Sequence, residues 1–223
     1  MRKECKISMP LYKIAYAVSF VILLSLVRGV FYSFEVGIAL EPPMAILTAV
    51  FCADTYVMEI VAKRSEIWRL YPLKKKLYSI YMRLFLQQFF LLLLAAAGYG
   101  LFFLFQKPRV SGVTSITLIS EAAQFWIFLA SSLVTIVFWG IFSNTIACIF
   151  RNMWFGIGAS LILWILTNST LGDRYLGKWN IFSYSFRNVE NSSDFGWICG
   201  KIICICLGIT AIAVLPKIIE KRR

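Results

Sequence analysis

Six long apolar segments occupy most of this chain and restrict what it can fold into. A helix needs about 20 apolar residues to cross the hydrocarbon core of a bilayer. We expect spans at residues 14–34, 44–61, 84–105, 122–150, 154–171 and 197–215. The chain has 223 residues, of which 60% are hydrophobic and 15% charged. A soluble domain of this size could not bury so much apolar surface. The sequence therefore predicts one all-α, multi-pass transmembrane domain.

The first apolar segment also resembles a signal peptide, because basic residues precede it. No small-residue cleavage site follows, and Arg28 leads into further apolar sequence. We expect a retained first span.

Basic residues indicate which side of the membrane each loop faces. Sixteen of the 23 Lys and Arg residues lie in the first 13 residues, in 63–83, at Arg151 and from Lys217 onward. With six spans these segments share one side, and the positive-inside rule places that side in the cytoplasm. We expect both termini inside. Attraction to anionic lipid accounts for the net charge of +12 without nucleic acid as a partner.

Several enzyme classes are disfavoured by composition. The chain has no His, which removes Ser-His and Cys-His catalysis and the HExxH zinc pattern. Its six Cys show no metal-type spacing, and neither a GxSxG motif nor a GxxxxGK[ST] phosphate loop occurs. We expect no catalytic site, no metal and no cofactor in this chain.

The most informative segment joins the second and third expected spans. It reads KRSEIWRLYPLKKKLYSIYMR over residues 63–83, and its pattern predicts a short amphipathic helix at 63–72, followed by a basic cluster. The segment resembles the ABC-2 type permeases, the membrane subunits of ATP-driven exporters. Glu66, Pro72 and the basic residues from Lys74 to Arg83 match that family's cytoplasmic helix. The alternative is an ordinary positive-inside loop with a helix at the membrane surface.

The resemblance implies a coupling helix that docks into a separate ABC ATPase subunit. The residues it would assign to coupling are Glu66, Ile67, Trp68, Arg69, Leu70, Tyr71 and Pro72. It also implies two ATPase subunits per complex, which hold ATP and Mg, and a second permease copy, identical or related. The implied location is a plasma membrane, of bacterial type, and the implied cargo is a hydrophobic or amphipathic substrate, with small amphipathic or antimicrobial peptides favoured.

Polar residues inside the expected spans are the second functional signal, because charges in lipid are costly. Candidates for a substrate path or a polar network are Arg28, Asp54, Glu59, Gln87, Asn144 and Lys201. Arg28 and Lys201 could instead extend toward the membrane surface. We expect Asp54 near the bilayer middle, with a partner from another helix or from the second copy.

Other functions remain open from the sequence. A stand-alone transporter or channel would suit paired charges in the spans but would leave the basic segment unexplained. A membrane-embedded enzyme and a protein of immunity or assembly are further alternatives.

Overall fold

The computed structural model describes residues 7–33, 35–57, 72–108, 121–182 and 196–220, without the side chains of residues 121 and 196. Their regular elements are helices: α2 (Leu11–Val27), α3 (Glu35–Cys52), α6 (Leu73–Gln106), α7 (Glu121–Phe150), α8 (Met153–Asn168), α9 (Thr170–Leu176), the 3-10 helix η1 (Gly177–Trp179) and α10 (Gly196–Glu220). The expected all-helical fold is confirmed for this part of the chain.

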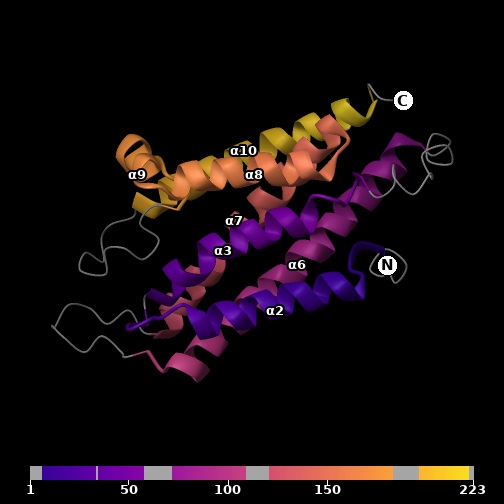
Figure 1. Ribbon diagram of the computed structural model, residues 1–223. Coiled ribbons are helices and arrows are strands. Elements are labelled where there is room, and N and C mark those ends of the chain that lie inside the picture. The colour runs from indigo at the N-terminus through magenta and orange to yellow at the C-terminus, as the bar shows by residue number, and fades with distance from the viewer. Residues whose placement is uncertain (1–6, 34, 58–71, 109–120, 183–195, 221–223) are drawn as a thin grey trace.

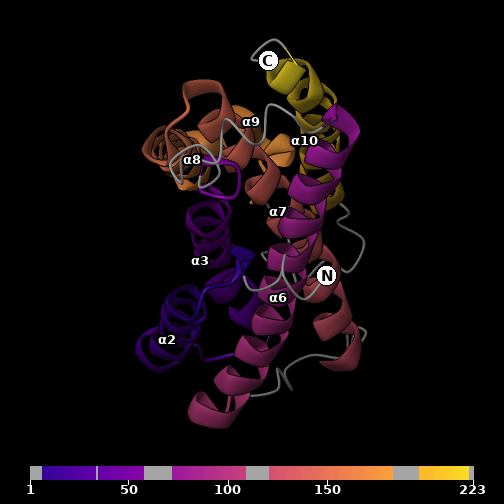
Figure 2. The same cartoon turned by 90° about the vertical axis from the view of Figure 1, so that its right-hand side faces the viewer.

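The apolar helices run roughly lengthwise through an elongated bundle and alternate in direction (Figure 1). Helix α2 begins, α3 ends, α6 begins and α10 ends at the same end of the bundle. Helix α7 lies among α3, α6, α8 and α10 and contacts all four, whereas α2 packs against α6 and α3 (Figure 2). The start of α2 and the end of α10 therefore lie at one end of the molecule.

Four helices are long and apolar enough to cross a membrane: α3, α6, α7 and α10. Helices α8 and α9 with η1 pass the same test together, but the chain bends by 72° between them, so they form a broken span or a re-entrant segment. Helix α2 is apolar but has only 17 residues. The chain thus has the helices of a membrane-embedded protein, with four or five candidate spans.

Local sequence explains where several helices begin. Pro10 and Pro72 precede α2 and α6, where a fixed φ suits the start of a helix. Asn152 caps α8, its side-chain oxygen accepting the Trp154 N–H at 2.9 Å. The Ser169 hydroxyl accepts the Gly172 N–H at 3.3 Å, so a new helix starts at the bend.

Helix α3 differs most from the sequence expectation, because it begins and ends nine residues earlier than the expected range of 44–61. Pro42 and Pro43 lie inside this helix. Asp54 therefore lies just beyond the end of α3, in a turn at 53–56, and not midway along a span. The last helix, α10, continues past the expected span 197–215 to Glu220, with Pro216 inside it.

Two clusters of buried apolar side chains hold the bundle together. The larger one joins α2, α3, α6, α7 and the end of α10 through residues such as Val21, Leu91 and Leu215. The smaller one joins α3, α7 and α10 to the chain after η1: Ala45, Ala49, Phe138, Trp139, Ile181 and Cys204. A buried ion pair accompanies each cluster.

Candidate functional site

The first buried ion pair joins the start of α2 to the turn that follows α3. The Lys13 ammonium donates to an Asp54 carboxylate oxygen and, at 3.0 Å, to the Phe51 carbonyl. It also lies 5.1 Å from the centre of the Phe51 ring, within the range of a cation–π contact. Lys13 and Asp54 are both buried. Asp54 thus has its partner on another helix of the same chain.

Helix α6 joins this group through Gln87, which is fully buried. The Gln87 side-chain NH₂ donates to the Ser8 carbonyl at 2.9 Å, and its oxygen accepts the Thr55 hydroxyl at 2.7 Å. We call Ser8, Lys13, Asp54, Thr55 and Gln87 the Lys13 cluster. It binds α2, the end of α3 and α6 to one another by polar contacts.

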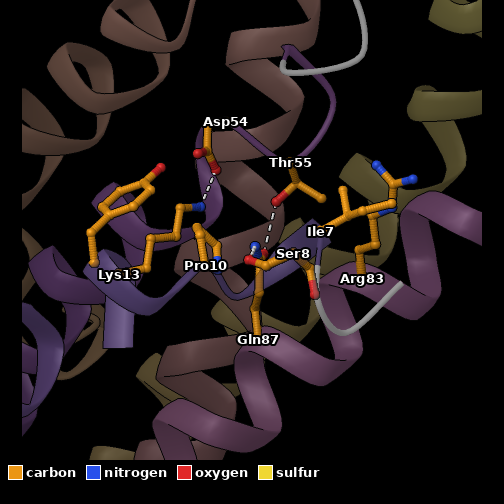
Figure 3. A pocket seen from close by; sticks show the side chains of 9 residues that line it. Ile7, Ser8, Pro10, Lys13, Asp54, Thr55, Arg83 and Gln87 are labelled. Carbon is orange, nitrogen blue, oxygen red and sulfur yellow. Dashed lines mark hydrogen bonds and ion pairs between the residues drawn. The ribbon is translucent and has the colours of Figure 1, made fainter. Parts of the chain in front are cut away.

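A small pocket opens beside the Lys13 cluster (Figure 3). Its lining residues come from the start of α2, from the turn after α3 and from α6: Ile7, Ser8, Pro10, Tyr12, Lys13, Asp54, Thr55, Arg83 and Gln87. The pocket lies where the chain leaves α3 toward residues 58–71 and returns in α6.

The second buried ion pair lies toward the other end of the bundle. The Lys201 ammonium on α10 donates to Glu41 of α3, to the Thr135 hydroxyl at 2.8 Å and to the Ile181 carbonyl at 3.1 Å. Glu41 also accepts the Thr135 hydroxyl at 2.6 Å, and the Ser131 hydroxyl lies 3.1 Å from both carboxylate oxygens. We call Glu41, Ser131, Thr135, Lys201 and the Ile181 carbonyl the Lys201 cluster.

Both clusters satisfy their charges internally. Removing one member of a buried ion pair leaves the other charge without compensation, which typically costs about 3–5 kcal/mol. Each pair joins distant parts of the sequence, over 41 residues for Lys13–Asp54 and 160 for Lys201–Glu41. The pairs therefore link helices that lie far apart in the sequence.

The predicted polar residues divide among different environments. Asp54 and Gln87 meet in the Lys13 cluster, and Lys201 defines the other. Arg28 is exposed at the end of α2, where its carbonyl accepts the Gln106 side-chain NH₂ at 2.6 Å. Asn144 is fully buried, and its side chain has no hydrogen-bond partner among the described residues.

The predicted coupling residues mostly lie outside the described residues, as does Glu59. This holds for Glu66, Ile67, Trp68, Arg69, Leu70 and Tyr71. Pro72 is described, exposed, and directly precedes α6. Helix α6 starts at Leu73, eleven residues before the expected span, so the basic residues Lys74, Lys75 and Lys76 form its first turn.

The sequence interpretation missed two charged residues, Lys13 and Glu41. Lys13 belongs to the basic N-terminal flank of the first expected span, and Glu41 falls between the first two expected spans. The sequence nevertheless marks Glu41 as a carboxylate that needs a distant partner. No Lys or Arg lies near it, and an apolar run begins directly after Pro42 and Pro43.

Comparison with known proteins gives no relative for this chain: no family model, no curated protein and no solved structure matches it. Among the described residues, no group of three or more His, Cys, Asp or Glu side chains could hold a metal ion.

Proposed function

We propose that this chain is the membrane-spanning permease subunit of an ABC exporter. In this proposal it moves a hydrophobic or amphipathic substrate outward, a small amphipathic peptide by preference, and ATP hydrolysis occurs on a separate ATPase subunit. The complex holds two ATPase subunits and a second permease copy in a bacterial plasma membrane. The observation that supports the proposal is the Lys13 cluster.

The Lys13 cluster joins the turn just before residues 58–71, the segment that resembles a coupling helix, to α6, the helix that follows it. Asp54 and Thr55 precede that segment by a few residues, and Gln87 lies four turns into the helix that follows it. Of the N-terminal region, Lys13 bonds the chain before that segment, and Ser8 bonds Gln87 after it. A force applied to the segment would therefore reach α2, α3 and α6 together.

Charge at this end of the bundle also supports a cytoplasmic orientation. Lys74 and Lys75 in the first turn of α6, Arg151 between α7 and α8, and Lys217 near the end of α10 are exposed there. Such residues favour the cytoplasmic face. An ATPase subunit would approach from that side.

The test uses the residues assigned to coupling by resemblance. In a complex of the chain with its ATPase subunit, Trp68→Ala and Tyr71→Ala should reduce co-purification of the ATPase or abolish its stimulation by the permease, because both remove aromatic docking surface. Binding is measured by pull-down, and ATP turnover by phosphate release.

Tyr175→Ala is the matched control, because Tyr175 is 81% exposed on α9, at the opposite end of the bundle. It should leave binding and ATP turnover unchanged. If Trp68→Ala and Tyr71→Ala behave like Tyr175→Ala, the coupling assignment fails.

A stand-alone transporter or channel is the second candidate, favoured by the two buried ion pairs. Charged groups inside a membrane bundle often belong to ion or proton pathways. Transport by the purified chain alone, reconstituted in vesicles without any ATPase, would support this candidate against the exporter.

A further inference from the structure

Lys201 uses all three of its ammonium hydrogens, and each goes to a different part of the fold. One bonds Glu41 on α3, one bonds Thr135 on α7, and one bonds the Ile181 carbonyl after η1. A lysine ammonium has three donors and no acceptor, so its capacity is filled. A single side chain on α10 thus holds two helices and one non-helical segment.

The non-helical segment, residues 180–182, lies inside the protein beside this lysine. Asn180 and Ile181 are 1% and 5% exposed. The Asn180 side-chain NH₂ donates to the Thr167 carbonyl at 2.7 Å and to Asp173 at 3.1 Å. Phe182 stacks on Trp139 of α7, with 6.0 Å between ring centres. Asn180 and Ile181 are therefore buried between α7, α8 and α10, and Phe182 is partly buried.

Gly200 permits the close approach of this segment to α10. A Cβ atom at Gly200 would lie 2.2 Å from the Asn180 carbonyl oxygen and 3.0 Å from its carbon, both backbone atoms. Lys201 is the next residue, so the segment rests on α10 at the point where the ammonium bonds the Ile181 carbonyl. Both residues belong to the apolar stretch of a candidate span.

Non-helical backbone at membrane depth is stable in two environments only: buried in protein, or lining a water-filled space. Asn180 and Ile181 lie beside Gly200 and Lys201, near the start of a candidate span, and are buried in protein. If the Lys201 contacts were lost, water could form hydrogen bonds with the Ile181 carbonyl and the Asn180 amide instead. Glu41 lies directly before Pro42 and Pro43, which supply no N–H to the carbonyls one turn earlier, so α3 can bend beside the ion pair.

We propose that Lys201 and Glu41 form a releasable latch that keeps residues 180–182 against the bundle. Release separates the Ile181 carbonyl from Lys201 and admits water between α3, α7 and α10. Because an ion pair and its hydrogen bonds act over a short range, a displacement of one helical turn breaks all three contacts together.

Cys204 gives a reporter for the latch. It is fully buried, lies one turn from Lys201 and belongs to the same apolar cluster as Ile181. In the full chain with the other five Cys replaced by Ala, its reaction with a water-soluble maleimide measures opening. Ile181→Cys in a Cys-free chain is the second reporter, on the segment itself.

The decisive variant combines Glu41→Met with Lys201→Met, because replacing both partners leaves no buried charge unpaired. The Ser131 and Thr135 hydroxyls can then donate to carbonyls of their own helix, as the Thr145 hydroxyl does to the Ile141 carbonyl at 2.7 Å. Labelling of both reporters should accelerate about tenfold or more. Lys217→Met, the same substitution at an exposed position of α10, should leave both rates unchanged.

Three outcomes would overturn the latch. The double variant could fold, by circular dichroism and size-exclusion chromatography, and label at the parent rate. The labelling rate could rise at Cys204 but not at Ile181→Cys, which would indicate a local cavity beside residue 201. The double variant could also fail to fold, which would make the pair a permanent part of the fold.

A role for the latch in export rests on the proposed function, and a separate arm tests it. With the ATPase subunit bound, ATP should change the labelling rate of the unmodified latch. If the double variant opens but ATP has no effect on the parent complex, the latch stands and the exporter proposal loses support.

Discussion

At the scale of single residues, two carboxylates in apolar surroundings are each paired by a lysine from a distant element. The sequence predicted that Asp54 would need a partner from elsewhere, and Lys13 of α2 is that partner. The sequence did not identify Lys13, because a basic residue near the N-terminus has a sufficient explanation in the positive-inside pattern. Which charged side chains contact one another depends on how the helices pack, and the spacing of apolar residues in the sequence does not show this.

Asp54→Asn tests whether this carboxylate ties the fold or serves transport. The amide keeps the size of the side chain but leaves the Lys13 ammonium without its counter-charge. As a structural tie, Asp54→Asn should lower stability in detergent by about 3 kcal/mol or more, and transport per folded molecule should stay the same. Thermal unfolding and vesicle transport of the same preparation measure both quantities.

Lys13→Met supplies the matched half of a double-variant cycle. Combined with Asp54→Asn, it should cost less than the sum of the two single changes, since neither charge is then left unpaired. Additive losses would mean that the two side chains do not interact in the folded protein. Altered transport with unchanged stability would place Asp54 on the substrate route.

At the scale of helices, the sequence located α7 almost to the residue, because its apolar run is long and unbroken. It misplaced α3, because Glu41 and the two prolines resemble a loop followed by a helix start. A buried lysine and two hydroxyls compensate Glu41 there, so the helix can begin at Glu35. The bend at Ser169 was also missed, since apolarity continues into Leu171 and only the Ser169 cap marks the break.

Gly200→Ala should disturb the contact between α10 and the segment after η1. The added methyl group would meet the Asn180 carbonyl at 2.2 Å, which backbone atoms cannot yield without a shift. We expect a loss of roughly 1–3 kcal/mol in thermal unfolding, the usual range for overpacking. Gly208→Ala, on the same helix with nothing within 4 Å, should be neutral or slightly stabilising. Equal effects of the two substitutions would contradict the close approach.

At the scale of the whole molecule, the helices give a consistent two-ended arrangement. Helix α6 has 34 residues and spans about 50 Å, whereas the hydrocarbon core is about 30 Å thick. Helix α6 therefore extends beyond the hydrocarbon core, and its first turn carries exposed lysines. Helix α2, at about 26 Å, is slightly short for a span. Six passes with both termini in the cytoplasm remain our prediction.

Thiol labelling in a Cys-free chain tests that topology. Lys75→Cys, in the first turn of α6, should react with an impermeant maleimide only from the cytoplasmic side, and Tyr175→Cys on α9 only from outside. Both positions are exposed and lie toward opposite ends of the bundle. Leu93→Cys, exposed in the middle of α6, should react from neither side because lipid covers it. Reaction of Lys75→Cys and Tyr175→Cys from one side would exclude the predicted number of passes.

The pairing of Glu41 with Lys201 has a consequence for how the chain is made. The two residues are separated by 160 positions, and ribosomes add roughly 5–20 residues per second. Helix α3 therefore leaves the ribosome about 8–30 s before the lysine that compensates its carboxylate. Ser131 and Thr135 emerge in between and can bond Glu41 first. During synthesis the Glu41 carboxylate on α3 thus lacks its cationic partner until α10 is made.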